Sequence, residues 1–158
     1  MREKLILVVA GALFAGLVAS GCGGDDDDEA AGTTAPSEPL SRQEFVIAAD
    51  AICASGDREI ERQAAQTFGN QEPSEEEIEQ FATDTIIPNI QSQVDQLRTL
   101  APPEGDEEEV TAILDAAQSG VDEVEQDPSL AAEGSDAGGA FTEANNLARD
   151  YGLKDCGG

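Results

Sequence analysis

The stretch that decides the fold reads Ser41-Arg42-Gln43-Glu44-Phe45-Val46-Ile47-Ala48-Ala49-Asp50-Ala51-Ile52-Cys53. It opens with a capping box, because a Ser and a Glu three positions apart can each satisfy a backbone N–H of the other at a helix start. Small or apolar residues then recur every three or four positions, at Phe45, Ala49, Ile52, Gly56, Ile60 and Ala64. This spacing predicts an amphipathic helix that ends near Phe68-Gly69-Asn70, with Cys53 at the edge of its apolar face.

The same design repeats downstream. Ser74 and Glu77 form a second capping box, and an apolar stripe follows at Ile78, Phe81, Ala82, Thr85 and Ile86. Pro88 interrupts the stripe, because proline has no N–H and its ring clashes with the preceding turn. The stripe resumes at Ile90, Val94, Leu97 and Ala101. We expect one kinked helix, or two short helices that meet at Ile87-Pro88, with the proline structural rather than a hinge.

Two more helices are expected after Ala101-Pro102-Pro103. Carboxylates crowd positions 104–109, where they suit the positive end of a helix dipole, and a stripe follows at Val110, Ile113, Leu114, Ala117, Val121 and Val124. Asp127-Pro128 stops this helix, and 129–139 has the composition of a small, flexible connection. The last helix is expected over 140–151. Gly152 then suits the left-handed residue after a helix, and Leu153 suits the apolar contact that accompanies it.

No strand pattern competes with these helices, since alternation of polar and apolar residues never persists. The segments and their short connections predict an all-α fold, an antiparallel bundle of about four helices over residues 41–158. The whole chain has five Phe, one Tyr and no Trp. A core with so few aromatic residues is weak for its size, so we expect a disulfide to matter for its stability.

The N-terminus has the pattern of an export signal. Basic residues lie in Met1-Arg2-Glu3-Lys4, and 5–18 carries no charge, a stretch too short to span a bilayer as a mature helix. The small residues Ala19-Ser20-Gly21 precede Cys22, which resembles a bacterial lipobox, although Ala19 stands where Leu is usual. We expect residues 1–21 to be a lipoprotein signal peptide and Cys22 to carry lipid, whose two acyl chains hold stably to a membrane. The alternatives are a plain signal peptide cut nearby and an uncleaved anchor helix.

An acidic linker separates Cys22 from the helical region. Residues 22–40 contain the run Asp25-Asp26-Asp27-Asp28-Glu29 and little that is apolar, which predicts a disordered tether. The run lacks the Gly and the final Glu that an EF-hand calcium loop places at fixed positions. A solvated spacer is therefore the better interpretation.

The three cysteines of the chain are Cys22, Cys53 and Cys156. Lipid on Cys22 leaves a pair, and paired cysteines in a small exported domain are usually bridged. We therefore expect a Cys53–Cys156 disulfide. Two buried free thiols are the alternative.

Charge and composition argue against several functions. The formal net charge is −26 at pH 7, so the surface repels nucleic acid, and no nucleic-acid partner is expected. The chain has no His, which removes the commonest general base and the commonest transition-metal ligand. We expect no metal site, no cofactor and no catalytic residues.

Carboxylates are the one abundant reactive group. Some share a helix surface, at Glu72, Glu75, Glu76 and Glu79 and again at Glu104, Glu107 and Glu108. Such groups could hold calcium weakly, or a pair could serve a hydrolase, but a solvated acidic face is the simpler interpretation. Tyr151 and Lys154 suit packing and capping at the end of a helix.

Three segments together resemble small exported lipoproteins of actinobacterial type. They are Glu44-Phe45 with Ala49-Asp50-Ala51-Ile52-Cys53, the mid-chain Leu100-Ala101-Pro102-Pro103, and Ala148-Arg149-Asp150-Tyr151-Gly152-Leu153-Lys154-Asp155-Cys156. The likeness covers nearly the whole chain, and its motifs are structural rather than catalytic. It implies a shared fold and disulfide and carries no activity.

These patterns favour a lipoprotein held to the cell membrane by lipid on Cys22 and exposed on the extracytoplasmic face. We expect a non-enzymatic binding or structural module of the cell envelope, with an envelope protein as a candidate partner. The alternative is a protein that binds a small ligand or a divalent cation, using the Pro88 kink and the acidic helix starts. A carboxylate-dependent hydrolase comes third.

Overall fold

The computed structural model describes residues 38–133 and 137–158. The chain divides into two units, Met1–Thr34 and Ala35–Gly158, and the described residues belong to the second. The predicted signal peptide, Cys22 and residues 22–37 of the predicted linker lie outside them. In the part that is described, no helix is both long enough and apolar enough to cross a membrane.

Helix α1 spans Arg42–Phe68 and confirms the first predicted helix. The backbone N–H of Glu44 donates to the Ser41 hydroxyl over 3.3 Å, and the Ser41 N–H donates to the Glu44 carboxylate over 3.0 Å. The helix buries Phe45, Ala49, Cys53 and Gly56, so the face read from the sequence is the face that packs. It ends at Gly69, whose φ of 59° is one that side chains rarely tolerate.

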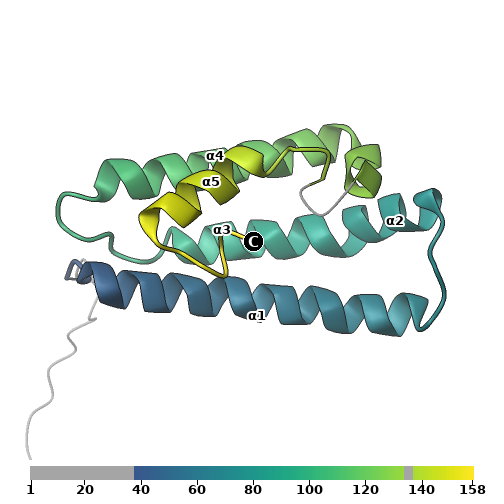
Figure 1. The fold of residues 1–158 in the computed structure, drawn as a ribbon, viewed down its shortest axis with the longest axis horizontal. Coiled ribbons are helices and arrows are strands. Elements are labelled where there is room, and N and C mark those ends of the chain that lie inside the picture. The colour runs from purple at the N-terminus through teal and green to yellow at the C-terminus, as the bar shows by residue number, and fades with distance from the viewer. Residues whose placement is uncertain (1–37, 134–136) are drawn as a thin grey trace, which may run out of the picture. The chain divides into compact units, whose positions relative to one another are not determined.

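The second helical region is an uninterrupted series of helical elements, and α3 begins at the expected junction, Ile87-Pro88 (Figure 1). It comprises α2 (Glu75–Phe81), a π-helix (Ala82–Ile86) and α3 (Ile87–Leu97). The Ile87 N–H donates to the carbonyl of Ala82, five residues earlier. This wider turn contains one more residue than an α-helical turn and lies immediately before Pro88. Proline has no N–H, so it would interrupt the regular series of α-helical hydrogen bonds there. The junction expected at Ile87-Pro88 is therefore present, and a π-helix precedes it.

The third and last helices lie where they were predicted. Helix α4 spans Glu107–Gln126, and α5 spans Thr142–Tyr151. Gly152 is left-handed with φ 108°, and the N–H of the buried Leu153 donates to the Ala148 carbonyl over 2.9 Å. The connection differs from the expectation of a wholly irregular segment, because Pro128–Glu133 forms a 3₁₀-helix that packs against α2.

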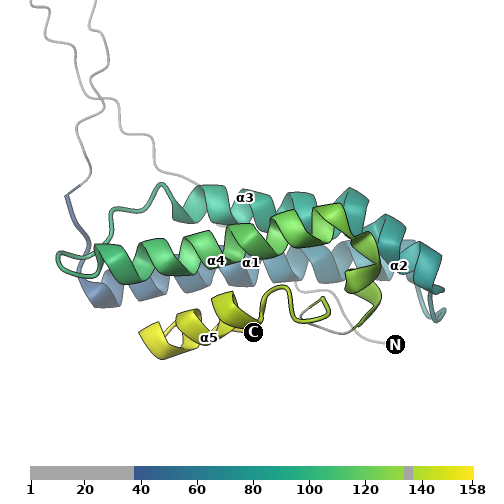
Figure 2. The same ribbon diagram turned by 90° about the horizontal axis from the view of Figure 1, so that it is seen from above.

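The described residues are all-helical, as predicted, with no strand among them. They form five α-helices rather than about four, because the π-helix divides one rod into α2 and α3. Helix α1 runs along the α2–α3 rod, α4 packs on α3, and α5 packs on α4 (Figures 1 and 2). Successive rods run in opposite directions.

The buried core forms two separate clusters. The disulfide cluster consists of Phe45, Ala49, Cys53, Leu97, Val110, Ile113, Ala148, Tyr151 and Leu153. The π-helix cluster has Ile87, Val121 and Val124 at its centre, with Ile90, Leu130, Ala131, Ala137, Ala140 and Phe141 packed around them. The apolar stripes of the sequence therefore do not merge into one continuous core.

Two glycines set the spacing of the rods. A Cβ on Gly56 of α1 would lie 2.0 Å from the Gln93 side-chain nitrogen on α3. A Cβ on Gly120 of α4 would lie 2.6 Å from the ring of Phe141. Because real Cβ atoms do not approach other atoms so closely, each position brings the neighbouring elements closer than a side chain would allow.

Candidate functional site

The predicted disulfide is present. Cys53 and Cys156 are bridged, with their Cα atoms 5.1 Å apart. The bridge attaches the segment after α5 to the middle of α1. The first and last helical segments are therefore covalently joined, as the two cysteine positions indicated.

Asp50 holds the same C-terminal segment by hydrogen bonds. Its carboxylate accepts from the backbone N–H groups of Lys154, Asp155 and Cys156, at 2.9, 3.0 and 3.4 Å. Asp50 precedes Cys53 by three residues, so both project from one side of α1. Sequence reasoning quoted Asp50 without assigning it a role. Its position one helical turn before Cys53 could have indicated that it lies beside the bridged C-terminal segment.

Tyr151 anchors the end of α5. Its hydroxyl donates to Asp106 over 2.8 Å, and the Arg42 guanidinium lies 4.2 Å from the centre of its ring. Arg42 also pairs with Asp106 at 3.7 Å and with Glu109 at 3.3 Å, and the Phe45 ring meets Tyr151 edge-on at 5.9 Å. Burial, and next the bond to Asp106, raise the pKa of Tyr151 to about 12. The group fastens α1, α5 and the start of α4 together, as expected of a packing residue.

A cavity of about 330 Å³ separates the two core clusters. Its walls include Leu97 and Ile113 of the disulfide cluster and Ile90 and Phe141 of the π-helix cluster. Both bridged cysteines line it as well. Large apolar side chains on the wall remain only half-buried, at Ile60, Ile86, Ile90, Leu114 and Phe141. The cavity is therefore an apolar space with access to solvent, and sequence reasoning did not anticipate it.

The polar groups of this cavity are few. Gln93 is buried and donates to Asn89 over 2.8 Å, and Asn145 of α5 is half-buried. The exposed side chains of the lining are two aspartates, Asp57 and Asp155. Burial raises the pKa of Asp57, and the negative charges of Asp155 and Glu61 raise it further, while Arg58 acts in the opposite direction. The opening of the cavity is therefore acidic.

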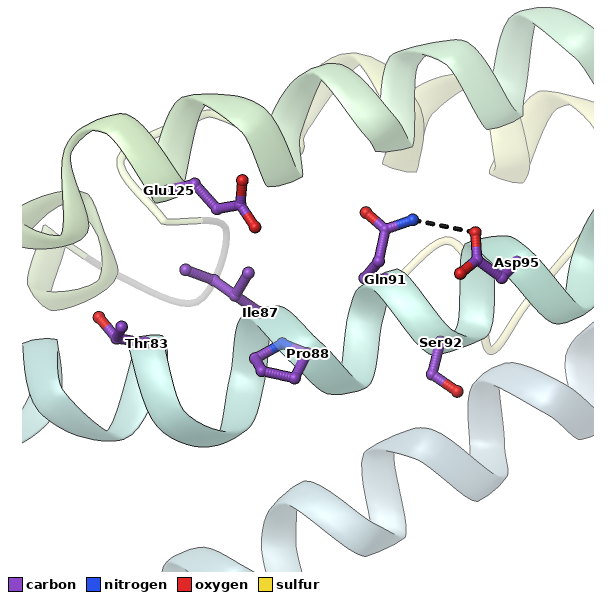
Figure 3. A pocket seen from close by; sticks show the side chains of 7 residues that line it. All are labelled: Thr83, Ile87, Pro88, Gln91, Ser92, Asp95 and Glu125. Atoms are coloured by element: carbon purple, nitrogen blue, oxygen red, sulfur yellow. Dashed lines mark hydrogen bonds between the residues drawn. The ribbon is translucent and has the colours of Figure 1, made fainter.

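A broader hollow of about 700 Å³ lies beside Pro88 (Figure 3). Side chains of the π-helix–α3 rod line it together with Glu125 of α4, and Gln91 donates to Asp95 within it over 3.0 Å. Most of its lining is exposed, including Thr83, Pro88, Ser92, Asp95 and Glu125. It is an open surface depression whose apolar side chains are those of Ile87 and Pro88, and its greater volume does not make it the better binding site.

The acidic helix starts serve the helices themselves. The Glu77 carboxylate accepts from the Ser74 N–H over 2.9 Å, and that of Glu107 accepts from the Gly105 N–H over 2.8 Å. Bonds from the backbone and hydroxyl of Ser74 lower the pKa of Glu77. Within residues 38–133 and 137–158, no three His, Cys, Asp or Glu side chains are grouped so that they could hold a metal ion.

No family model matches the chain, and comparisons with the curated proteins and with the solved structures find no match either. Family membership therefore contributes nothing to the functional argument. The features that bear on function are the helical fold, the disulfide and the cavity between the two clusters.

Proposed function

We propose that the chain is a lipoprotein anchored to the cell membrane through lipid on Cys22, and that its helical region is a non-enzymatic binding module on the extracytoplasmic face. The basic start, the short apolar stretch and the small residues before Cys22 support the anchor. The disulfide supports the compartment, because such bonds persist outside the reducing cytosol. The cavity supports the binding role.

The cavity between the two core clusters is the observation that carries this proposal. Its volume of about 330 Å³ lies within the range of small-molecule sites, about 300–1,000 Å³, and ligand sites in bundles lie between helices. A space of this size holds about ten water-sized groups. The module therefore binds a small, largely apolar molecule with a body of about ten non-hydrogen atoms.

Ligand binding would complete the core. Half-buried apolar side chains at Ile60, Ile90 and Leu114 face the cavity. An apolar ligand removes this surface from water at about 25 cal/mol for each Å² covered. The same contacts would join the disulfide cluster to the π-helix cluster. Binding should therefore raise the melting temperature of the protein.

Calorimetric titration with eight-carbon probes tests the site. We expect at least one of n-octylammonium, n-octanol and octanoate to bind with a stoichiometry of one. Ala117 of α4 lines the cavity, and Ala117→Leu should fill part of it and abolish binding. The matched control is Ala112→Leu on the exposed side of α4, which should bind like the parent. If no probe binds, or if Ala117→Leu binds as well as the parent, the cavity is not a binding site.

Metabolic lipid labelling tests the anchor. Cys22→Ser should abolish incorporation of labelled lipid and should leave the protein released or its precursor uncut. Cys53→Ser is the control that changes a cysteine without changing the lipidation site. Unchanged mass and membrane fraction in Cys22→Ser would show that the lipoprotein assignment is wrong.

A further inference from the structure

We propose that the molecule bound in the cavity is an amphipathic cation, with an apolar body between the helices and one positive charge held by Asp57 and Asp155. This inference rests on the proposed binding role of the cavity. It adds the chemical class of the ligand, because the walls and the opening of the site differ in character.

The walls select the apolar body. Ile60, Ile86, Ile90, Leu114 and Phe141 come from different parts of the bundle and leave part of their surface exposed along one space. The polar wall groups Gln93 and Asn145 carry no charge. A charged group placed deep in this space would lose its hydration without gaining an ionic partner, which is costly. The charge of the ligand must therefore remain at the opening.

The opening selects the sign of that charge. Of the side chains that line the cavity, only those of Asp57 and Asp155 are exposed, so both carboxylates lie where the cavity meets solvent. Asp57 is one turn beyond Cys53 on α1, and Asp155 immediately precedes Cys156. The Cys53–Cys156 bridge therefore places two like charges from distant parts of the chain at one site.

The Asp57 carboxylate lies close enough to Asp155 for the two negative charges to interact. Burial raises the pKa of Asp57, the negative charges of Asp155 and Glu61 raise it further, and Arg58 acts in the opposite direction. A cation at the opening would relieve this repulsion, whereas an anionic head group would add to it. The net charge of −26 also concentrates cations around the whole chain.

A set of probes with one alkyl chain and three head groups tests the inference. We expect n-octylammonium to bind about tenfold more tightly than n-octanol at low salt, and octanoate to bind most weakly. Raising the salt concentration should reduce the difference between the ammonium and the alcohol, because screening weakens charge interactions near the surface. Butylammonium should bind much more weakly than octylammonium, because it covers less of the apolar wall.

Charge-neutralising variants identify the carboxylates involved. The double variant Asp57→Asn with Asp155→Asn should reduce the affinity for octylammonium about tenfold, to that of octanol, and leave octanol binding unchanged. Asp115→Asn is the matched control, because Asp115 is exposed on α4 and does not line the cavity. It lowers the total charge but should leave octylammonium binding unchanged. A melting curve of each variant checks that it is folded.

Each outcome bears on one of the two proposals. If octanol and octylammonium bind equally and Ala117→Leu blocks both, the cavity is a binding site but the cation inference is wrong. The inference is also wrong if the double variant retains the preference for ammonium, or if Asp115→Asn loses it to the same extent. If no member of the series binds, the binding role itself is overturned.

Discussion

The two ends of the bundle hold their helices together by different means. At one end, a covalent bridge and the Asp50 carboxylate join segments 103 and 104 residues apart in sequence, and the Arg42–Tyr151–Asp106 group adds contacts among α1, α5 and the start of α4. At the other end, the π-helix cluster buries only Ile87, Val121 and Val124 fully. The first end is fastened by a covalent bond and by hydrogen bonds between distant segments, whereas the second has a small apolar cluster beside the reciprocal Gln91–Gln118 amide pair of α3 and α4. The cavity lies where these two modes of stabilisation meet.

Of the changes considered, breaking the Cys53–Cys156 bridge should lower the unfolding free energy most, and it should weaken the disulfide end. Cys53→Ser, Cys156→Ser and the double variant should each lose about 2–5 kcal/mol of unfolding free energy, because any of them opens the same closed loop. Chemical denaturation followed by circular dichroism measures the loss. The parent with reductant should behave like the variants. Two free thiols in unreduced protein from an oxidising compartment would contradict the bridge.

The π-helix end can be weakened separately. Val121 is fully buried in the π-helix cluster, and Val121→Ala should cost about 2 kcal/mol through lost burial and the space left behind. The exposed Thr111→Ala on the same helix is the control and should change little. In Val121→Ala, the rate of amide hydrogen exchange should increase more in α2 and the π-helix than in the disulfide cluster. Equal acceleration at both ends would show that the two clusters unfold as one.

Tyr151 makes the disulfide end sensitive to alkali. Its pKa is raised to about 12, above the ordinary value of about 10, so its protonated form favours the folded state. This contribution is complete below about pH 10 and is lost as the pH rises from 10 toward 12. Tyr151→Phe should remove that pH dependence and cost about 1 kcal/mol at neutral pH, because it deletes the bond to Asp106.

The measurement is unfolding free energy as a function of pH, together with the absorbance of tyrosinate. Tyr151 is the only tyrosine in the chain, so the titration reports on this side chain alone. A parent protein whose tyrosine titrates near pH 10, or whose unfolding free energy changes between pH 10 and pH 12 in the same way as that of Tyr151→Phe, would contradict the assigned environment.

Pro88 should have the smallest effect. It is exposed, and the π-helix before it already accommodates the missing N–H. Pro88→Ala should therefore change the unfolding free energy by less than about 1 kcal/mol. The change should be visible mainly as slower hydrogen exchange of the amides near Ile87, because regular α-helical hydrogen bonds can form there once the proline is removed. A loss several times larger would mean that the proline holds the π-helix in place.

Local signals in the sequence predicted most of the fold. The capping boxes at Ser41 and Ser74 and the helix stop at Gly152 each depend on residues within one turn, so they are visible without tertiary information. The Cys53–Cys156 pairing followed from a count of cysteines. These features set the starts of two helices, the end of another and the joining of first to last.

The remaining features depend on packing. A proline in an apolar stripe predicts an irregularity in the helix, but the stripe does not show that the irregularity is a π-helix over Ala82–Ile86. The cavity arises because α1, α3, α4 and α5 do not close fully on one another, which no single stripe reveals. Asp50 was visible as a residue, but its three N–H donors belong to a segment 104 to 106 residues away.

The disulfide also determines how the chain would respond to tension. Cys53 and Cys156 are separated by 103 residues, and a force applied between residues before the first and after the second passes through the bridge. The chain between them carries none of the load while the bond is intact. Fully extended, that segment would span about 350 Å, at 3.3–3.6 Å for each residue. Pulling could unwind the first turns of α1, but it could not draw out the walls of the cavity.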